Sequence, residues 1–242
     1  MAIQIARFRV KEKIYQTSDI VTLKLIPIDK FDFDFKPGQF VNLYIQKENQ
    51  PMLARPYSIA SSPSNKEYLE LTIRIVEGGR FTPRVAELKV GDEVKIGGPF
   101  GKFFFLDEKK MKKLVLIGGG CGITPFISMI RHVVDKKLDI KITYFYSART
   151  MDSILYKDEL EKYAKENSNI KVVFTCTRET SDAWKGERGR INIDMIKKYA
   201  DLNDKENYFM LCGPPAMVSD LVAALKNSGV KEDRILHESW SA

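Results

Sequence analysis

The apolar residues of this chain follow two different patterns, and the pattern changes near residue 107. Before that point apolar and polar residues alternate, as Val41, Leu43 and Ile45 do with the residues between them. Alternation with period two predicts strands that have one buried face. Turn-forming residues separate the expected strands: Pro37-Gly38, Gly78-Gly79 and Gly97-Gly98-Pro99. Many short strands divided in this way predict a small antiparallel β-barrel, with a short helix near residues 83–88.

After residue 107 apolar runs alternate with stretches of helical periodicity. Residues 114–117 are continuously apolar and end in glycines, which is typical of a parallel strand buried on both faces. Further strands are expected at 140–146, 172–176, 208–212 and 234–237, and helices at 127–134, 155–164, 193–199 and 218–225. This alternation predicts a doubly wound parallel α/β sheet. We therefore predict two domains, a barrel over residues 1–107 and an α/β domain over residues 108–242.

Composition narrows the class of protein. The chain has 242 residues, of which 44% are hydrophobic and 29% charged, so a packed protein with two modest domains is expected. Because no apolar run reaches membrane-spanning length and the N-terminus lacks a signal-peptide block, we expect a cytoplasmic protein without membrane contact. Three scattered cysteines and two histidines argue against an iron–sulfur cluster or a metal site.

The net charge of +7 has two interpretations. It is the charge of an ordinary solvated surface, or it attracts an acidic partner. Nucleic acid is not expected as a partner, because the basic residues are scattered and no nucleic-acid-binding module is visible. The oligomeric state is not predicted by any feature of the sequence.

A glycine-rich loop follows the first expected strand of the α/β domain. The loop reads Gly118-Gly119-Gly120-Cys121-Gly122-Ile123-Thr124-Pro125 and opens an expected helix. Glycines let a pyrophosphate approach the main chain, and a helix N-terminus offers free amides to it. Thr124 is expected to cap the helix, with Pro125 in its first turn. This position in the chain favours dinucleotide binding over a simple tight turn.

The segment Arg55-Pro56-Tyr57-Ser58 resembles the flavin motif of the ferredoxin–NADP reductase superfamily. The resemblance implies that Arg55 pairs with the FAD pyrophosphate, that Tyr57 packs on the isoalloxazine ring, and that Ser58 lies near the ring nitrogen which accepts the hydride. A guanidinium suits phosphate and a flat aromatic ring suits a flat cofactor.

Further motifs of the superfamily follow in order along nearly the whole chain. They are Pro37-Gly38-Gln39-Phe40, the strand Ile73-Arg74-Ile75, the loop Gly78-Gly79-Arg80-Phe81-Thr82, the segment Gly98-Pro99-Phe100-Gly101, the glycine loop, and Cys212-Gly213-Pro214-Pro215. The resemblance implies that the strand Ile73-Arg74-Ile75 contacts FAD, and that the loop Gly79-Arg80-Phe81-Thr82 does so as well. It implies that Gly119, Gly120, Cys121, Gly122 and Thr124 contact the nicotinamide nucleotide.

Three residues of the α/β domain, Cys212, Glu238 and Trp240, are expected beside the nicotinamide and flavin rings. The resemblance implies that Cys212 lies beside the nicotinamide, with Gly213 and Pro214, although a buried cysteine is more often simply part of a core. Glu238 and Trp240 match the superfamily's terminal glutamate and ring-covering aromatic residue. The alternative for Trp240 is a frayed terminus, since two residues follow it.

The nucleotide is expected to be NADP(H), with NAD(H) as the alternative. Arg149, Arg178 and Arg190 follow expected strands, and no acidic residue stands at the end of the second strand. Guanidinium groups suit the extra ribose phosphate, whereas an acid would suit the free ribose hydroxyls of NAD(H). The alternative is that the three are ordinary surface arginines.

The resemblance implies an FAD-dependent reductase that takes a hydride from NADPH and gives single electrons to an acidic carrier such as ferredoxin or flavodoxin. Ser58, Cys212 and Glu238 are its expected catalytic residues. Two alternatives remain, an NADH-dependent reductase component of an oxygenase or cytochrome system, and an electron-transfer subunit of a larger oxidoreductase. A third alternative is a non-catalytic nucleotide-binding module. Purification of the protein without bound flavin would support it.

Overall fold

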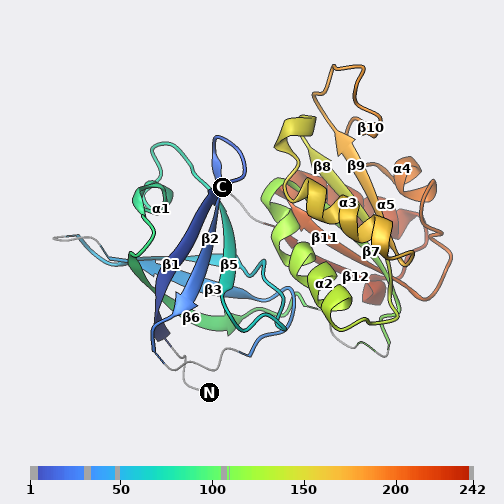
Figure 1. Cartoon of the computed structure of the whole chain (residues 1–242). Helices are drawn as coiled ribbons and strands as arrows, with labels where there is room; N and C mark the ends of the chain where they lie inside the picture. The colour runs from blue at the N-terminus through green and yellow to red at the C-terminus, as the bar shows by residue number, and fades with distance from the viewer. Residues whose placement is uncertain (1–4, 30–33, 47–49, 105–107, 109, 240–242) are drawn as a thin grey trace.

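The computed structural model describes residues 5–29, 34–46, 50–104, 108 and 110–239. They form a barrel and an α/β domain that lie side by side (Figure 1). The predicted boundary between residues 107 and 108 falls at a segment that is only partly described, and it remains a prediction. Within the described ranges no helix is long and apolar enough to cross a membrane.

The barrel is an antiparallel sheet with the strand order β4-β3-β6-β1-β2-β5. An antiparallel bridge between Ile59 and Leu71 joins the two end strands, so the sheet is nearly closed. This confirms the predicted barrel, and the short helix is also present. The elements are β1 (Ile5–Tyr15), β2 (Ile20–Pro27), β3 (Phe40–Ile45), β4 (Leu53–Ser58), β5 (Leu69–Arg74), α1 (Thr82–Glu87) and β6 (Glu93–Phe100).

The alternation of apolar residues places one face of each strand inside the barrel. Val41, Leu43 and Ile45 of β3 are buried, as predicted. The turn predicted at Gly97-Gly98-Pro99 is wrong, because β6 continues through it to Phe100. A Cβ atom on Gly97 would lie 3.1 Å from the Tyr44 ring, and one on Gly98 would lie 3.1 Å from the Val41 side chain. These glycines therefore allow β6 to pack closely against β3.

The α/β domain is an all-parallel sheet with the order β10-β9-β8-β7-β11-β12, which confirms the doubly wound prediction. Helices α2 and α3 cover one face through Phe126 and Leu160, and α4 and α5 cover the other through Ile196 and Leu221. Its strands are β7 (Lys113–Gly119), β8 (Lys141–Ala148), β9 (Ile170–Cys176), β10 (Glu187–Arg188), β11 (Asn207–Gly213) and β12 (Ile235–Ser239). Its helices are α2 (Thr124–Asp135), α3 (Lys157–Glu166), α4 (Ile193–Lys197) and α5 (Pro215–Asn227), with the 3₁₀ turns η1 (Gly120–Ile123), η2 (Met151–Ser153) and η3 (Glu232–Arg234).

The strand order reverses at β7. From β7 the chain adds β8, β9 and β10 on one side, and then returns to add β11 and β12 on the other. In open parallel sheets ligands bind at such a reversal, beyond the carboxyl ends of the two strands. Here those ends carry Gly119 on β7 and Gly213 on β11. The sheet therefore brings the glycine loop next to the predicted cysteine motif.

Candidate active site

The predicted flavin motif lies on β4, at one end of the barrel sheet's strand order. Arg55 and Pro56 are exposed, and Arg55 Nη1 donates to the carbonyl oxygen of Ala54 at 2.8 Å. The half-buried ring of Tyr57 lies 6.0 Å from the ring of Phe81. Ser58 is buried, and its Oγ has no hydrogen-bond partner among the described residues. A buried hydroxyl is normally satisfied, so Ser58 offers a hydrogen bond that only a ligand or water can complete.

The predicted FAD phosphate loop is closed by Thr82. Its Oγ1 accepts from the amide of Val76 at 2.9 Å and donates to the Val76 carbonyl at 3.2 Å. A Cβ atom on Gly79 would lie 2.9 Å from that carbonyl, so the loop needs a glycine there. Arg80 is exposed at the loop, whereas Phe81 is buried against Tyr57.

The three residues Ile73, Arg74 and Ile75, which are predicted to contact FAD, lie at the end of β5 or directly after it and differ in exposure. Ile73 is fully buried in the barrel core, Arg74 is exposed, and Ile75 is half-buried. The Arg74 guanidinium pairs with Asp19 at 3.2 Å. Of the three, Arg74 and the half-buried Ile75 are therefore the residues whose side chains reach the surface.

The glycine loop forms the turn η1 and leads directly into α2. The capping role predicted for Thr124 is wrong: Thr124 is already helical, and its Oγ1 donates to the Cys121 carbonyl at 3.0 Å instead of accepting from an amide. The reason is that η1 supplies helix-like backbone before α2, so the helix has no extended capping residue. Pro125 is expected at the first helical position, and it stands in the first turn as the second residue of α2.

The glycine loop and the cysteine motif touch each other. A Cβ atom on Gly122 would lie 2.2 Å from the Cys212 carbonyl oxygen, and one on Gly213 would lie 3.2 Å from the Gly119 amide nitrogen. Gly120 has a φ of +54°, and its carbonyl accepts from the Tyr146 hydroxyl at 3.2 Å. Pro214 directly precedes α5. Glycine is thus required where the two loops form one crevice, and Tyr146, which the sequence analysis did not identify, supports it.

Cys121 brings the glycine loop against the barrel. Burial raises the pKa of the Cys121 thiol, and the nearby positive charge of Arg74 opposes that rise. A Cβ atom on Gly120 would lie 3.8 Å from Arg74 Nη2. Burial also raises the pKa of Tyr57, and Cys121 contributes to that rise. The nucleotide loop therefore lies beside the flavin motif, across the junction of the domains.

Cys212 and Glu238 stand together at the carboxyl ends of their strands. Cys212 is fully buried and pairs in register with Gly118 on one side and Glu238 on the other. Glu238 Oε2 is buried and has no hydrogen-bond partner among the described residues. Burial raises the pKa of Glu238 to about 7. Trp240 lies outside the described residues, so its predicted stacking stays a prediction.

The three predicted phosphate-binding arginines lie beyond neighbouring strands of the sheet. Arg149 follows β8, and its carbonyl accepts from the Arg178 amide at 2.8 Å; Arg190 follows β10. All three are exposed. The ion pairs of described arginines involve Arg7, Arg9, Arg74 and Arg131, and none of these three. Their guanidinium groups are thus available to an anion.

Comparison with known proteins identifies the family. Residues 6–105 match the sequence model of the oxidoreductase FAD-binding domain, and residues 116–223 match that of the oxidoreductase NAD-binding domain. The chain is 31% identical to the reductase component of propane 2-monooxygenase from Mycolicibacterium smegmatis, over 99% of this chain and 69% of that protein. The chain belongs to the ferredoxin–NADP reductase superfamily.

Other similar proteins belong to different enzyme systems. The gamma subunit of sulfhydrogenase 1 from Pyrococcus furiosus is 36% identical, over 83% of this chain and 66% of that subunit. The solved ferredoxin reductase in carbazole 1,9a-dioxygenase superposes with a TM-score of 0.83 at 28% identity, and the match covers all of this chain and 70% of that one. The chain spans 62–69% of the length of the first curated oxygenase reductases that it matches.

The residues of this site fit the two cofactors of the ferredoxin–NADP reductase superfamily. The unsatisfied oxygens of Ser58 and Glu238 lie on opposite domains, and a Cβ atom on Gly120 of the nucleotide loop would have only Arg74 Nη2 within 4 Å, at 3.8 Å. The chain is accordingly an oxidoreductase with an FAD-binding and an NAD-type nucleotide-binding domain.

Proposed function

We propose that this chain is the reductase component of an oxygenase system, taking a hydride from NAD(P)H onto FAD and passing single electrons to a separate protein. The observation that carries the proposal is the close approach of the nucleotide loop to the barrel, where a Cβ atom on Gly120 would lie 3.8 Å from Arg74 Nη2. This approach places the nucleotide loop and the flavin motif at the same junction between the domains. The family relatives support the partner class, because several are reductase components of oxygenases.

Each residue of the junction has a defined part in this proposal. Arg55, Gly79 and Thr82 hold the FAD pyrophosphate, and Tyr57 covers the flavin ring. The unpartnered Ser58 hydroxyl would donate a hydrogen bond to a flavin ring nitrogen when FAD is bound. Cys212 limits the position of the nicotinamide, and Glu238 accepts or returns a proton at its buried oxygen. Bringing two bound rings to contact supplies most of the rate enhancement. FAD, when bound, converts a two-electron donor into single-electron deliveries.

The choice of nucleotide depends on the exposed arginines. We propose that Arg149, Arg178 and Arg190 favour NADPH, since a ribose phosphate would meet three guanidinium groups that no described acid neutralises. The alternative is an NADH-dependent enzyme in which these arginines are solvated surface residues. Mixing the flavin-loaded protein with each nucleotide in a stopped-flow instrument separates the two: the preferred nucleotide reduces the flavin at the lower concentration.

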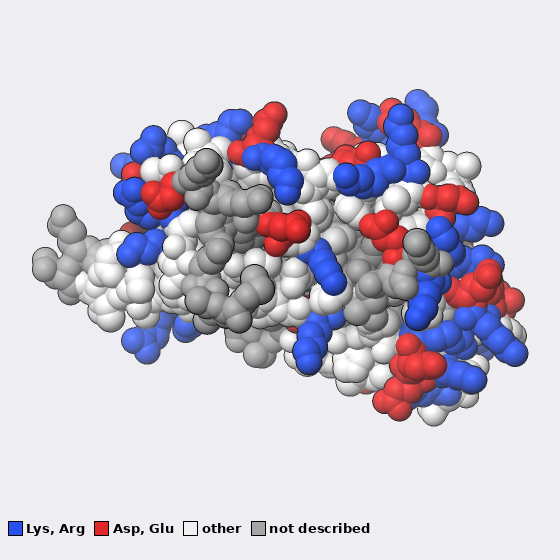
Figure 2. All heavy atoms as spheres, turned by 90° about the horizontal axis from the view of Figure 1, so that it is seen from below, with Lys and Arg blue, Asp and Glu red and all other residues white. Residues whose placement is uncertain are grey.

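The electron acceptor is the second part of the test. The net charge of +7 suits an acidic protein, although basic and acidic side chains are interspersed on the face in Figure 2. Reduced protein should be mixed with an oxygenase component, with a ferredoxin or flavodoxin, and with a cytochrome. Rapid electron transfer to the oxygenase component supports the proposal. Electron transfer to ferredoxin or flavodoxin alone supports a ferredoxin reductase instead. A purified protein that contains no flavin overturns both functions.

A second candidate is an electron-transfer subunit of a larger oxidoreductase. The relative that favours it is the sulfhydrogenase gamma subunit, which is 36% identical to this chain. Gel filtration of native extract distinguishes this function, because a stable complex elutes far ahead of a 27.7 kDa chain.

A further inference from the structure

Helix α2 connects the nucleotide loop to the flavin motif through side chains that no cofactor contact requires. The helix starts at Thr124, directly after the glycine loop. One turn further on, the fully buried Ser128 donates from its Oγ to the carbonyl oxygen of Ser61 at 2.7 Å. Arg131 then donates from Nη1 to the carbonyl oxygen of Ala60 at 2.8 Å. Ala60 and Ser61 follow Ser58 by two and three residues, so α2 is bound to the barrel next to the buried Ser58 hydroxyl.

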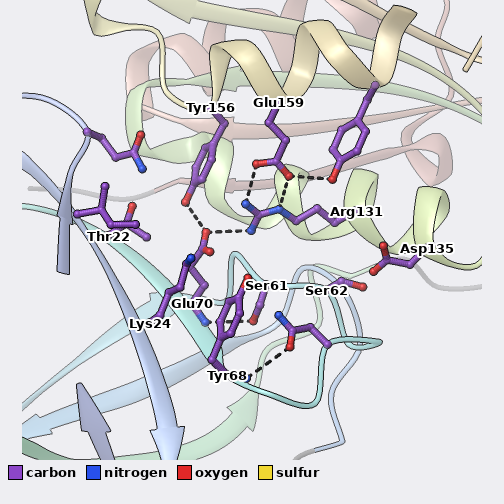
Figure 3. A pocket seen from close by; sticks show the side chains of 14 residues that line it. Thr22, Lys24, Ser61, Ser62, Tyr68, Glu70, Arg131, Asp135, Tyr156 and Glu159 are labelled. Carbon is purple, nitrogen blue, oxygen red and sulfur yellow. Dashed lines mark hydrogen bonds and ion pairs between the residues drawn. The ribbon is translucent and has the colours of Figure 1, made fainter. Parts of the chain in front are cut away.

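Arg131 also joins two carboxylates from different domains, the buried Glu70 and the partly exposed Glu159. Its Nη1 pairs with Glu70 of β5 at 2.9 Å, and its Nε and Nη2 pair with Glu159 of α3 at 2.7 and 2.8 Å (Figure 3). The side chains of Glu70 and Arg131 are only 3% and 14% exposed. The Tyr156 hydroxyl donates to Glu70 at 2.8 Å and also bonds Thr72. We call Glu70, Ser128, Arg131 and Tyr156 the interdomain clamp.

The clamp forms one wall of a cleft of about 480 Å³ between the domains. In Figure 3 Glu70 points from the barrel toward Arg131 and Tyr156, and Lys24 lies at the barrel side of the cleft. Within the clamp the Glu70 carboxylate accepts from both Arg131 and Tyr156, so it is already engaged by two donors. A buried ion pair adds little net stability over apolar packing, but its directional bonds fix geometry. The clamp therefore fixes how the domains face each other.

We infer that Ser128 and Arg131 are positioning residues that set the distance between the nicotinamide and flavin rings. The inference rests on the proposed function, which places one ring on each domain. Hydride transfer requires near-contact of the reacting atoms, and a displacement of about 1 Å can cost on the order of 100-fold in rate. Helix α2 carries the nucleotide loop at its start and Ser128 and Arg131 of the clamp along its length. A change of the clamp therefore moves one ring relative to the other without touching either binding site.

The competing explanation is that the clamp only holds the chain together. In that case its loss lowers stability and cofactor content, and hydride transfer in the loaded fraction stays unchanged. Two variants separate the explanations. Ser128→Ala removes one hydrogen bond to Ser61, and the double variant E70M/R131M removes both members of the buried interdomain pair, so that neither of these two charges is left without the other. Glu159, which also pairs with Arg131, is 28% exposed and keeps its bond from the Tyr163 hydroxyl. Arg234→Met is the matched control, because Arg234 bonds only Asp204 and Asn207 within the α/β domain.

The flavin-loaded proteins are compared in four measurements: FAD content, the nucleotide dissociation constant, the rate and deuterium isotope effect of flavin reduction in a single turnover, and small-angle X-ray scattering. We expect E70M/R131M to retain FAD and nucleotide affinity, to lose at least 10-fold in the reduction rate and to show a changed scattering profile. We expect Ser128→Ala to show a smaller loss in the same direction, and Arg234→Met to match the unmodified chain.

A rate per loaded flavin that falls no more than in Arg234→Met overturns the inference, as does an unchanged scattering profile. Failure of the proposed function gives a different result, because then the unmodified chain is not reduced by either nucleotide. The scattering comparison between E70M/R131M and Arg234→Met still reports whether the clamp fixes the domains in that case.

Discussion

Cys212 and Glu238 are register partners on the parallel strands β11 and β12, and they combine a fully buried thiol with a carboxylate oxygen that no described residue bonds. The β-sheet register holds the two at the same level of the crevice beyond β7 and β11. A change at either residue should therefore affect the reaction more than the binding of FAD, which the barrel motifs govern.

Replacing Cys212 tests its proposed place beside the nicotinamide. Cys212→Ala should slow flavin reduction by roughly 10-fold, because a displaced nicotinamide loses near-contact geometry, while the FAD content stays the same. Cys176→Ala, which removes another buried thiol from the same domain, is the control. Equal and small effects of both substitutions would assign Cys212 to the core only.

Glu238 should make the protein less stable as the pH rises. Its pKa is raised from 4.5 to about 7 by burial, so the folded state binds a proton that the unfolded state has already lost. The unfolding free energy should fall between about pH 4.5 and 7, by about 3 kcal/mol for a fully buried group and by about half of that for one that solvent still reaches. Glu238→Gln should abolish this dependence in urea unfolding at pH 5 and pH 8. Parallel pH profiles of the two proteins would contradict the assignment.

Arg55 should govern FAD affinity. Arg55→Ala removes a charge-assisted contact to the pyrophosphate, worth about 1.5–3 kcal/mol, or roughly 10- to 100-fold in the dissociation constant. Fluorescence titration of the flavin-free protein measures this loss. Arg9→Ala, on β1 and paired with Glu93, should bind FAD normally. Full FAD affinity in Arg55→Ala would remove Arg55 from the site.

Arg178 should discriminate between the two nucleotides. Loss of one guanidinium weakens NADPH binding by about 10- to 100-fold but leaves NADH nearly unaffected, since only NADPH carries the extra phosphate. Dissociation constants for both nucleotides in Arg178→Ala and in Arg188→Ala test this, because Arg188 bonds the carbonyls of Glu179 and Ser181 and serves as control. Equal losses for both nucleotides would show that Arg178 acts through the fold.

Gly122 should be the least tolerant glycine of the nucleotide loop. A Cβ atom there would overlap the main chain of Cys212 at 2.2 Å, whereas one on Gly120 meets only the end of Arg74 at 3.8 Å. Gly120→Ala should cost about 1–2 kcal/mol for its left-handed backbone, and Gly122→Ala should cost more and separate the two loops. Nucleotide affinity and thermal unfolding measure both. A milder effect of Gly122→Ala would show that the loops do not form one crevice.

The order of elements could be predicted from the sequence because each pattern is local. Period-two alternation in β3 and the apolar run of β7 place side chains on the correct faces, and a glycine cluster after β7 predicts the loop. The same local reasoning failed at Gly97-Gly98-Pro99, since the packing of Tyr44 and Val41 against β6 depends on residues over 50 positions away.

The contacts between domains could not be predicted. Arg131 stands on an amphipathic helix, where an arginine is usually solvated, and nothing near it in sequence indicates Glu70 on a barrel strand. The value of about 7 for the pKa of Glu238 likewise depends on burial that only the assembled sheet creates. Which residues border the cofactors stays a prediction from the motifs, whereas the fold shows how those residues are held.

The clamp divides its bonds between main chain and side chain, and this sets which substitutions the molecule tolerates. Ser128 and Arg131 bond the carbonyl oxygens of Ser61 and Ala60, which any residue would supply. Glu70 is different, because its carboxylate is buried and Arg131 supplies the opposite charge. These two bonds therefore place no requirement on the side chains at positions 60 and 61, which are buried for other reasons. Positions 70 and 131, in contrast, are expected to change together in descendants of this sequence. Glu70 and Arg131, which are 61 positions apart, are thus expected to vary as a pair.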